Sequence, residues 1–88
     1  KKELGSSIGI IEFFTISESV KALDMILKGN TVETLKLILG SGIAGKSYFI
    51  ITGDTSSVTE AVNSIDKKIR YREKSLINNP DKNIIKFI

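Results

Sequence analysis

The chain has no cysteine and no histidine among its 88 residues. The lack of cysteine excludes disulfides, thiolate chemistry and thiol-ligated iron–sulfur clusters, and the lack of histidine as well removes the usual zinc sites. Catalytic sites of the Cys–His and Ser–His–Asp kinds are also excluded, because their general base is a histidine. The ten Asp and Glu residues are scattered and form no paired acid–base motif. The sequence therefore predicts a protein that is not an enzyme and that holds no metal or other cofactor.

Long hydrophobic runs are also missing. The run from Tyr48 to Ile51 falls far short of the about 20 apolar residues that cross a bilayer, and no hydrophobic signal segment follows Lys1. The first residue is not Met, which is consistent with an excised or processed piece. Contents of 41% hydrophobic and 26% charged residues are ordinary for a folded protein. We expect a tail or linker over residues 1–6 and a single domain over residues 7–88.

Charge is nearly balanced, and the formal net charge of +3 comes from one stretch. That stretch holds five cations: Lys67, Lys68, Arg70, Arg72 and Lys74. A protein that binds nucleic acid would contact phosphates with such a cluster. Only Tyr71 interleaves as an aromatic, so a platform for stacking bases is missing. We interpret the stretch as a solvated helix end, whose cations complement the negative end of the helix dipole, and expect no nucleic-acid partner.

Apolar alternation predicts strands over residues 7–14, 32–39 and 47–52, and a last one lies around residues 75–78. The first is apolar on both faces, with Ile8 and Ile10 on one and Ile11 and Phe13 on the other. Gly9 inside it indicates that a helix or another backbone comes close. In the second strand we expect two faces: Leu35, Leu37 and Leu39 on one, and Thr34, Lys36 and Ile38 on the other.

Two helices are predicted between these strands. Thr15 and Glu18 form a capping box before the first, and Gly29 stands where a left-handed residue would end it. Ser57 and Glu60 form a second capping box for a helix that starts within residues 54–57. The expected apolar stripes are Val20, Leu23, Ile26 and Leu27 in the first helix, and Val58, Ala61, Val62, Ile65 and Ile69 in the second.

The order of elements is therefore β-α-β-β-α-β, followed by a short apolar tail over residues 83–88. Two helices of this order can pack on one face of a four-stranded sheet. The sequence predicts an α+β fold of the ferredoxin-like kind, with a mainly antiparallel sheet.

One glycine-rich segment, residues 40–47, has the letters of a phosphate-binding loop, Gly-x-x-x-x-Gly-Lys-Ser. Such a loop works because a helix follows it and directs backbone amides and the helix dipole at phosphate. Here Tyr-Phe-Ile-Ile-Thr follows Ser47, which is a strand pattern. We therefore interpret the segment as a connection between two strands, whose small residues allow tight turns and close approach of neighbouring copies.

Several fragments resemble, in order and spacing, parts of the bacterial microcompartment (BMC) shell domain, and together they cover about residues 7–80. They are Ser-Ile-Gly-Ile-Ile-Glu at residues 7–12; Ala22, Asp24, Lys28, Asn30, Val32 and Glu33; the runs 42–48 and 52–54; and Val58, Ala61 and Val62. The finer resemblance is to one repeat, the C-terminal one, of tandem-domain trimeric shell proteins. It depends on the Gly45-Lys46 pair and on the run 77–80 followed by Ile84, Ile85 and Ile88.

The resemblance implies a structural shell protein in the bacterial cytoplasm, of the kind found in propanediol or ethanolamine utilization compartments. Its domains would form flat hexamers, or pseudo-hexameric trimers, that join edge to edge with each other and with other shell proteins. Lys28 matches the lysine at the tile-to-tile edge. The pore loop that passes small metabolites would consist of Gly40, Ser41, Gly42, Ile43, Ala44 and Gly45.

Two departures from the family's patterns are visible. Some tandem shell proteins hold an iron–sulfur cluster on a Cys-Pro-Gly-Lys loop, and this chain has no cysteine to hold one. The family often ends its last strand with Pro-His, whereas Asp81 follows Pro80 here, so the histidine of that edge contact is missing.

Two other functions are compatible with the same order of elements. A small-molecule-binding regulatory domain would bind an amino acid at a dimer interface. An RNA-recognition domain would need exposed aromatics on its central strands, but Tyr48 and Phe49 are expected to face opposite ways. Fold order alone does not separate these alternatives from a shell protein.

Overall fold

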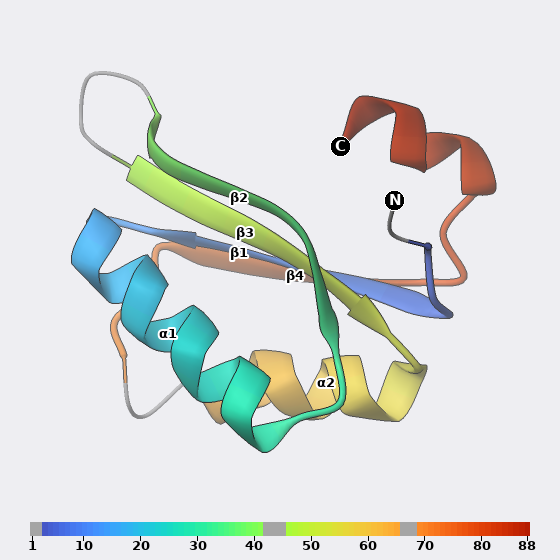
Figure 1. The fold of residues 1–88 in the computed structure, drawn as a ribbon, viewed down its shortest axis with the longest axis horizontal. Coiled ribbons are helices and arrows are strands. Elements are labelled where there is room, and N and C mark those ends of the chain that lie inside the picture. Colours follow the sequence, from blue (N-terminus) through green and yellow to red (C-terminus); the bar gives the residue numbers. More distant parts are fainter. Residues whose placement is uncertain (1–2, 42–45, 66–68) are drawn as a thin grey trace.

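The computed structural model describes residues 3–41, 46–65 and 69–88. Its elements are β1 (Ser7–Phe13), α1 (Ile16–Gly29), β2 (Glu33–Ser41), β3 (Lys46–Gly53), α2 (Thr55–Ser64), β4 (Glu73–Asn78) and the 3-10 helix η1 (Lys82–Phe87). The strands form one antiparallel sheet in the order β2-β3-β1-β4. Both α-helices lie on one face of it (Figure 1). The predicted α+β fold is confirmed. Among these residues, no helix combines the length and apolar character that crossing a membrane requires.

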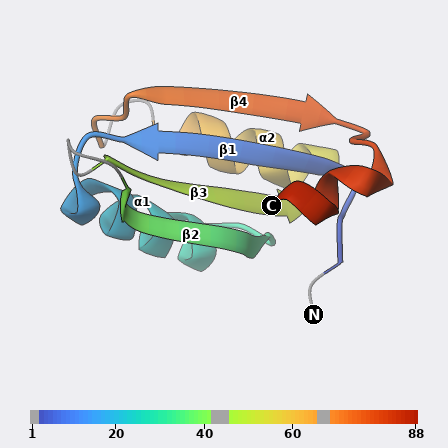
Figure 2. The same cartoon turned by 90° about the horizontal axis from the view of Figure 1, so that it is seen from above.

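The central strand β1 is buried on both faces, as its sequence predicts. On the helix side, Ile11 and Phe13 are fully buried, and the Phe13 ring packs on Phe49 of β3 with centroids 5.4 Å apart. On the other side, Ile8 is fully buried too. There the N-terminal segment and η1 lie near the end of the sheet where β1 begins (Figure 2). A strand that is apolar on both faces must be covered on both. For β1, the helices cover one face, and the two ends of the chain cover the other where the strand begins.

The C-terminal segment is more ordered than the apolar tail that the sequence predicts. Residues Lys82–Phe87 form the 3-10 helix η1, and the Asp81 side chain caps it by accepting a hydrogen bond from the Asn83 backbone amide at 2.8 Å. A 3-10 helix repeats every three residues. This segment is too short for such a repeat to be visible in its sequence.

Gly9 of β1 faces α2 at close range. A Cβ atom at this position would lie 2.7 Å from Val62 Cγ2 and 3.2 Å from Val58 Cγ1, both on α2. The missing side chain therefore lets the helix lie directly on the strand. The predicted close approach is confirmed, and its partner is a helix.

We expect Gly9→Ala to destabilise the fold by about 1–3 kcal/mol, the usual cost of overpacking a well-packed core. Val62→Ala removes the methyl group that the new Cβ would strike, so the double variant should lose less stability than the sum of the two single losses. Urea unfolding of the four proteins measures this coupling. If the losses of the two single variants simply add in the double variant, the contact with Val62 is not the cause of the destabilisation by Gly9→Ala.

The helix α1 begins as predicted but buries only part of the predicted stripe, Leu23 and Ile26. Thr15 caps it by accepting a hydrogen bond from the Glu18 amide at 3.2 Å. Val20 and Leu27, predicted to be in the core, are exposed. The residues that α1 buries are Ser19, Ala22, Leu23 and Ile26. The sequence prediction was wrong because Ser19 satisfies its own hydroxyl on the Ile16 carbonyl at 2.9 Å, and so can occupy the core face without an external partner.

The end of α1 also differs from its prediction. Gly29 is the last helical residue and does not adopt a positive φ. Asn30 caps the helix in an extended conformation, and its side-chain amide donates to the Ile26 carbonyl at 3.1 Å. A side-chain donor thus satisfies the last turn in place of the left-handed glycine.

The helix α2 begins at Thr55, within the predicted residues 54–57, but its cap is Asp54 and not the predicted Ser57. The Asp54 carboxylate accepts hydrogen bonds from the Ser57 amide at 2.8 Å and from the Ser56 hydroxyl at 2.9 Å. These bonds, the one from the Ser57 backbone above all, lower the pKa of Asp54 below its usual 3.8. The predicted apolar stripe is confirmed over Val58, Ala61, Val62 and Ile65, although the helix itself ends at Ser64.

The lowered pKa of Asp54 means that the folded state favours the charged carboxylate, so its stabilisation is present above pH 3.8 and is lost as the pH falls through the folded-state pKa. Asp54→Asn keeps a capping oxygen but carries no charge. We expect the variant to unfold at a lower urea concentration than the parent at pH 7, and the gap to close in acid. A gap that stays constant down to pH 2.5, about one unit below the ordinary aspartate range, would contradict this.

Candidate functional site

The β2–β3 hairpin ends where the sequence predicts an opening. The two strands stay paired up to Ser41 and Lys46, and the chain continues from Lys46 as a strand. The helix that a phosphate loop needs therefore does not follow, which confirms that interpretation of the motif. Of the predicted pore-loop residues, Gly40 and Ser41 lie at the end of β2, whereas Gly42, Ile43, Ala44 and Gly45 lie outside the described residues.

Gly40 has the backbone conformation that only glycine adopts easily. Its φ is +75°, and the register between β2 and β3 shifts beside it, between Ile38 and Ser41. A Cβ atom here would also lie 3.3 Å from Ile16 Cδ1 at the start of α1. The glycine thus lets the strand bend just before the loop while it stays close to α1.

Glu12 joins three strands beside this hairpin. Its carboxylate lies 3.4 Å from Lys46 Nζ on β3 and 3.1 Å from Arg72 Nη1, just before β4. Its backbone carbonyl also accepts a hydrogen bond from the Arg72 amide at 2.7 Å. We name Glu12, Lys46 and Arg72 the Glu12 cluster. A role for Glu12 was not predicted from the sequence, although a single carboxylate in a largely apolar strand is a visible signal.

The basic stretch is not the helix end that the sequence predicted. The last turn of α2 holds no basic residue, so the interpretation through the helix dipole is wrong. Instead, Arg70 lies 3.3 Å from the Glu18 carboxylate and over the Phe14 ring, 4.6 Å from its centroid. Lys67 and Lys68 lie outside the described residues. The described arginines thus fasten the segment before β4 to β1 and α1, and are engaged by partners within the domain.

Lys28, the predicted edge residue, lies in the last turn of α1. Its ammonium is 3.1 Å from the Asp24 carboxylate one turn earlier, and both side chains are largely exposed, at 77% and 61%. A pair this exposed contributes only about 0.3–0.5 kcal/mol. Lys28 can therefore exchange Asp24 for an external partner at little cost.

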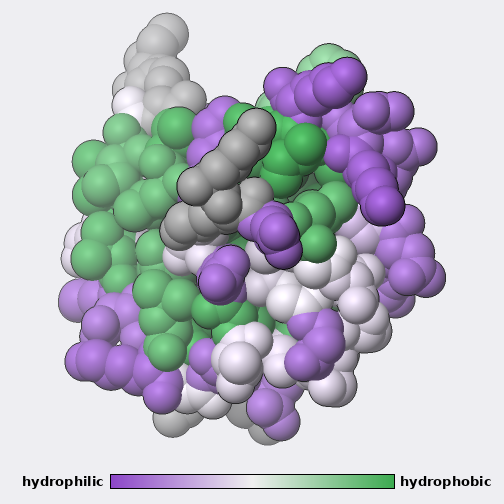
Figure 3. Space-filling view, turned by 45° about the vertical axis from the view of Figure 1, so that its right-hand side comes forward, coloured by the Kyte–Doolittle hydropathy of each residue, from purple (hydrophilic) through white to green (hydrophobic). Residues whose placement is uncertain are grey.

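Large apolar side chains are exposed where β2 meets α1. Each is 39–46% exposed: Ile16, Val20, Leu27, Leu37 and Leu39. We name them the β2–α1 patch. Figure 3 shows hydrophobic surface gathered on this side, below the hairpin. Because β2 is an edge strand, an uncovered apolar edge of this kind marks a contact surface.

A bulge in β2 changes which of its residues share a face. Thr34 pairs with Ile51 and Lys36 with Ile50, so Leu35 is an extra residue between them. Thr34 therefore lies on the face opposite Lys36, and the predicted grouping of Thr34 with Lys36 and Ile38 is wrong at Thr34. Sequence alternation assumes an unbroken period of two, which a bulge interrupts.

An edge strand with an uncovered apolar surface, such as β2 here, is typical of a domain that associates with other protein domains. The model of the BMC domain family matches residues 7–81. The chain belongs to the BMC domain family, and with it to the shell proteins of bacterial microcompartments.

Two similar proteins are both described as microcompartment proteins. The chain is 32% identical over 56 residues to the bacterial microcompartment shell protein PduT of Citrobacter freundii, a match that covers 64% of this chain and 30% of that protein. A solved microcompartments protein from Desulfitobacterium hafniense DCB is 29% identical, with a TM-score of 0.83 over 98% of this chain and 50% of that one. This chain thus spans half or less of each relative's length.

The family match favours a structural shell role over the regulatory and RNA-recognition alternatives. The aromatic argument against RNA is confirmed by the register, since Phe49 is buried in the core and Tyr48 lies on the opposite face, across from Glu12. In the part of the chain that the structure describes, no group of three or more acidic side chains is placed to hold a metal ion.

Proposed function

We propose that this chain is one domain of a shell tile, a flat ring of six such domains around a central opening that passes small metabolites. The observation that carries this is the family match over residues 7–81, together with the two longer microcompartment proteins that share the sequence or the fold. The division into a tail over residues 1–6 and a domain over residues 7–88 belongs to the same proposal. Its partners are other copies of the domain and other shell proteins, within the bacterial cytoplasm.

The ring contact is assigned to the β2–α1 patch. Its five side chains keep much of their apolar area in water, and covering that area by a neighbouring domain provides the main driving force for association. The patch lies beside the hairpin, so neighbours that cover it bring their hairpin ends toward one axis. This arrangement places Gly40 and Ser41 next to the opening.

The opening itself is assigned to residues 40–45. Apart from Ile43 their side chains are small, and only Ser41 carries a polar one, so backbone amides and the Ser41 hydroxyl would be the main polar groups that a passing solute meets. Such a lining does no chemistry and holds no metal. It is suited to small polar solutes, which replace the hydrogen bonds that water makes to those amides.

The proposal is tested by blocking the opening. In an intact shell that contains this protein, Ser41→Trp should slow the passage of a small metabolite several-fold, because an indole ring from each domain fills the opening. Asn63→Trp, on the exposed side of α2, is the matched control and should change nothing. Unaltered passage through a shell built with Ser41→Trp would overturn the assignment.

A further inference from the structure

The Glu12 cluster lies at the hairpin end of the sheet and brings one carboxylate together with two cations there. Lys46 is the first β3 residue after the loop, paired in register with Ser41. Its ammonium is 3.4 Å from the Glu12 carboxylate, and the Lys46 side chain is still 42% exposed. It is therefore engaged by Glu12 while its charge remains in contact with solvent beside the loop.

Charges of both signs meet on this face. Arg72 adds a second cation, 3.1 Å from Glu12, and Glu73 adds a second carboxylate, because it stands opposite Glu12 in the β1–β4 register. The cluster and Glu73 thus carry equal numbers of positive and negative charges. Removing Glu12 would leave Lys46 and Arg72 without their shared carboxylate.

We propose that Glu12 is a specificity-determining residue for the opening: it offsets the Lys46 charge, so that the opening passes small uncharged polar solutes and discriminates little between anions and cations. This rests on the proposed function, because the hairpin ends must surround the opening. A narrow opening focuses the field of nearby charges, and charges within about 8 Å act on a passing ion at physiological salt. The same cluster is repeated in every domain of the ring, so the effect of one residue is multiplied.

The experiment measures the reversal potential of assembled protein in an aperture between two KCl solutions of different concentration, which gives the chloride-to-potassium permeability ratio. For the parent, the expected ratio is near one. Glu12→Gln should raise it about twofold or more, since one unit charge at about 8 Å changes the local ion concentration by that factor. Glu12→Gln/Lys46→Gln removes both members of the pair and should restore the parent's ratio.

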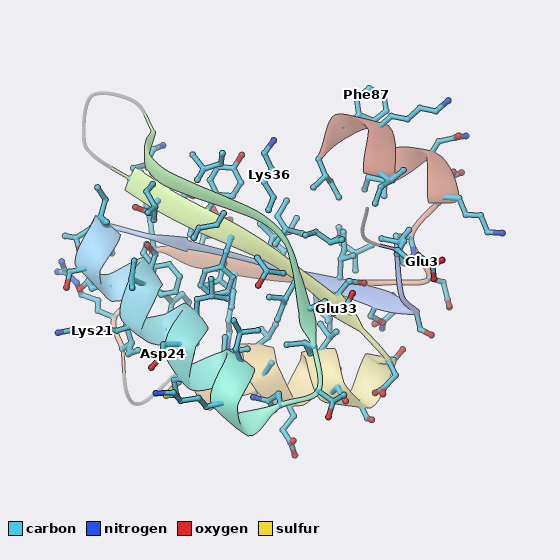
Figure 4. All side chains as sticks on the ribbon, viewed as in Figure 1. Glu3, Lys21, Asp24, Glu33, Lys36 and Phe87 are labelled. Carbon is cyan, nitrogen blue, oxygen red and sulfur yellow. The ribbon has the colours of Figure 1, made fainter. Side chains whose placement is uncertain are left out.

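A matched control distinguishes the effect of a charge beside the opening from the effect of the domain's net charge. Glu33→Gln removes the same charge at the opposite end of β2, far from the hairpin (Figure 4), and should keep the parent's ratio. Equal ratios for Glu12→Gln and Glu33→Gln would overturn the assignment of Glu12 alone. A parent current that Ser41→Trp fails to block would show that ions do not cross the predicted opening, and would overturn the proposed function and this inference together.

Discussion

Replacing Leu39 by aspartate is expected to abolish ring assembly while the domain stays folded. Leu39 is 46% exposed in the single domain, so the substitution removes about half of a leucine's buried area and places an aspartate in a strand; its effect on unfolding should be about 1–2 kcal/mol, which leaves the domain folded. In the ring, the same position is proposed to be covered. Covering a half-exposed leucine contributes about 1 kcal/mol, and an unpaired carboxylate in its place would cost several more.

The association constant should therefore fall by at least about 100-fold, which corresponds to about 2.7 kcal/mol. Sedimentation velocity over a range of concentrations measures it, and circular dichroism checks the fold. Val20→Asp, on the α1 side of the patch, should act in the same way, whereas Asn63→Asp carries the same charge on α2 and should leave assembly intact. If Leu39→Asp and Val20→Asp assemble as well as the parent, the β2–α1 patch is not the ring contact.

The second large effect is expected at the tile edge. Lys28→Ala and Lys28→Asp should abolish extended sheets and leave rings, because a charged contact between tiles sets their register and orientation. The fold should be nearly unaffected, since the exposed pair with Asp24 contributes only about 0.3–0.5 kcal/mol. Negative-stain electron microscopy distinguishes sheets from dispersed rings.

Lys21 provides the matched control for the edge. It lies on the same helix as Lys28, is exposed, and projects away from the sheet, as does Asp24 (Figure 4). Lys21→Ala should form sheets like the parent. Sheets of normal extent from both Lys28 variants would show that Lys28 is an ordinary solvated lysine at a helix end.

The fold was predictable because its strongest signals are local. The two-sided apolar strand with Ile8 and Phe13, the Thr15 cap and the α2 stripe each depend on residues close in sequence, and the structure confirms each. The errors come from features that a periodic pattern does not encode. Ser19 occupies the core face of α1 through a bond to its own helix, and Leu35 is a bulge residue that breaks the alternation of β2.

The candidate site was predictable only in part. The hairpin position of Gly40 and Ser41 followed from the strand pattern after Ser47, and the structure places both at the end of β2. Glu12 was missed because its partners Lys46 and Arg72 are distant in sequence and meet it only through the β3-β1-β4 order. The edge role of Lys28 is predicted by the family resemblance alone, because it depends on a contact between tiles and not on one within a single domain.

The most direct test of the central claim is a structure of the assembled protein by electron cryomicroscopy. The account predicts a ring of six domains, with six copies of this chain if it acts alone and three chains if it is one of two repeats. It also predicts the β2–β3 hairpin ends around the axis, with the β2–α1 patch covered by the neighbouring domain. A particle with any other number of domains, or a ring whose hairpin ends lie on its outer rim, would contradict it.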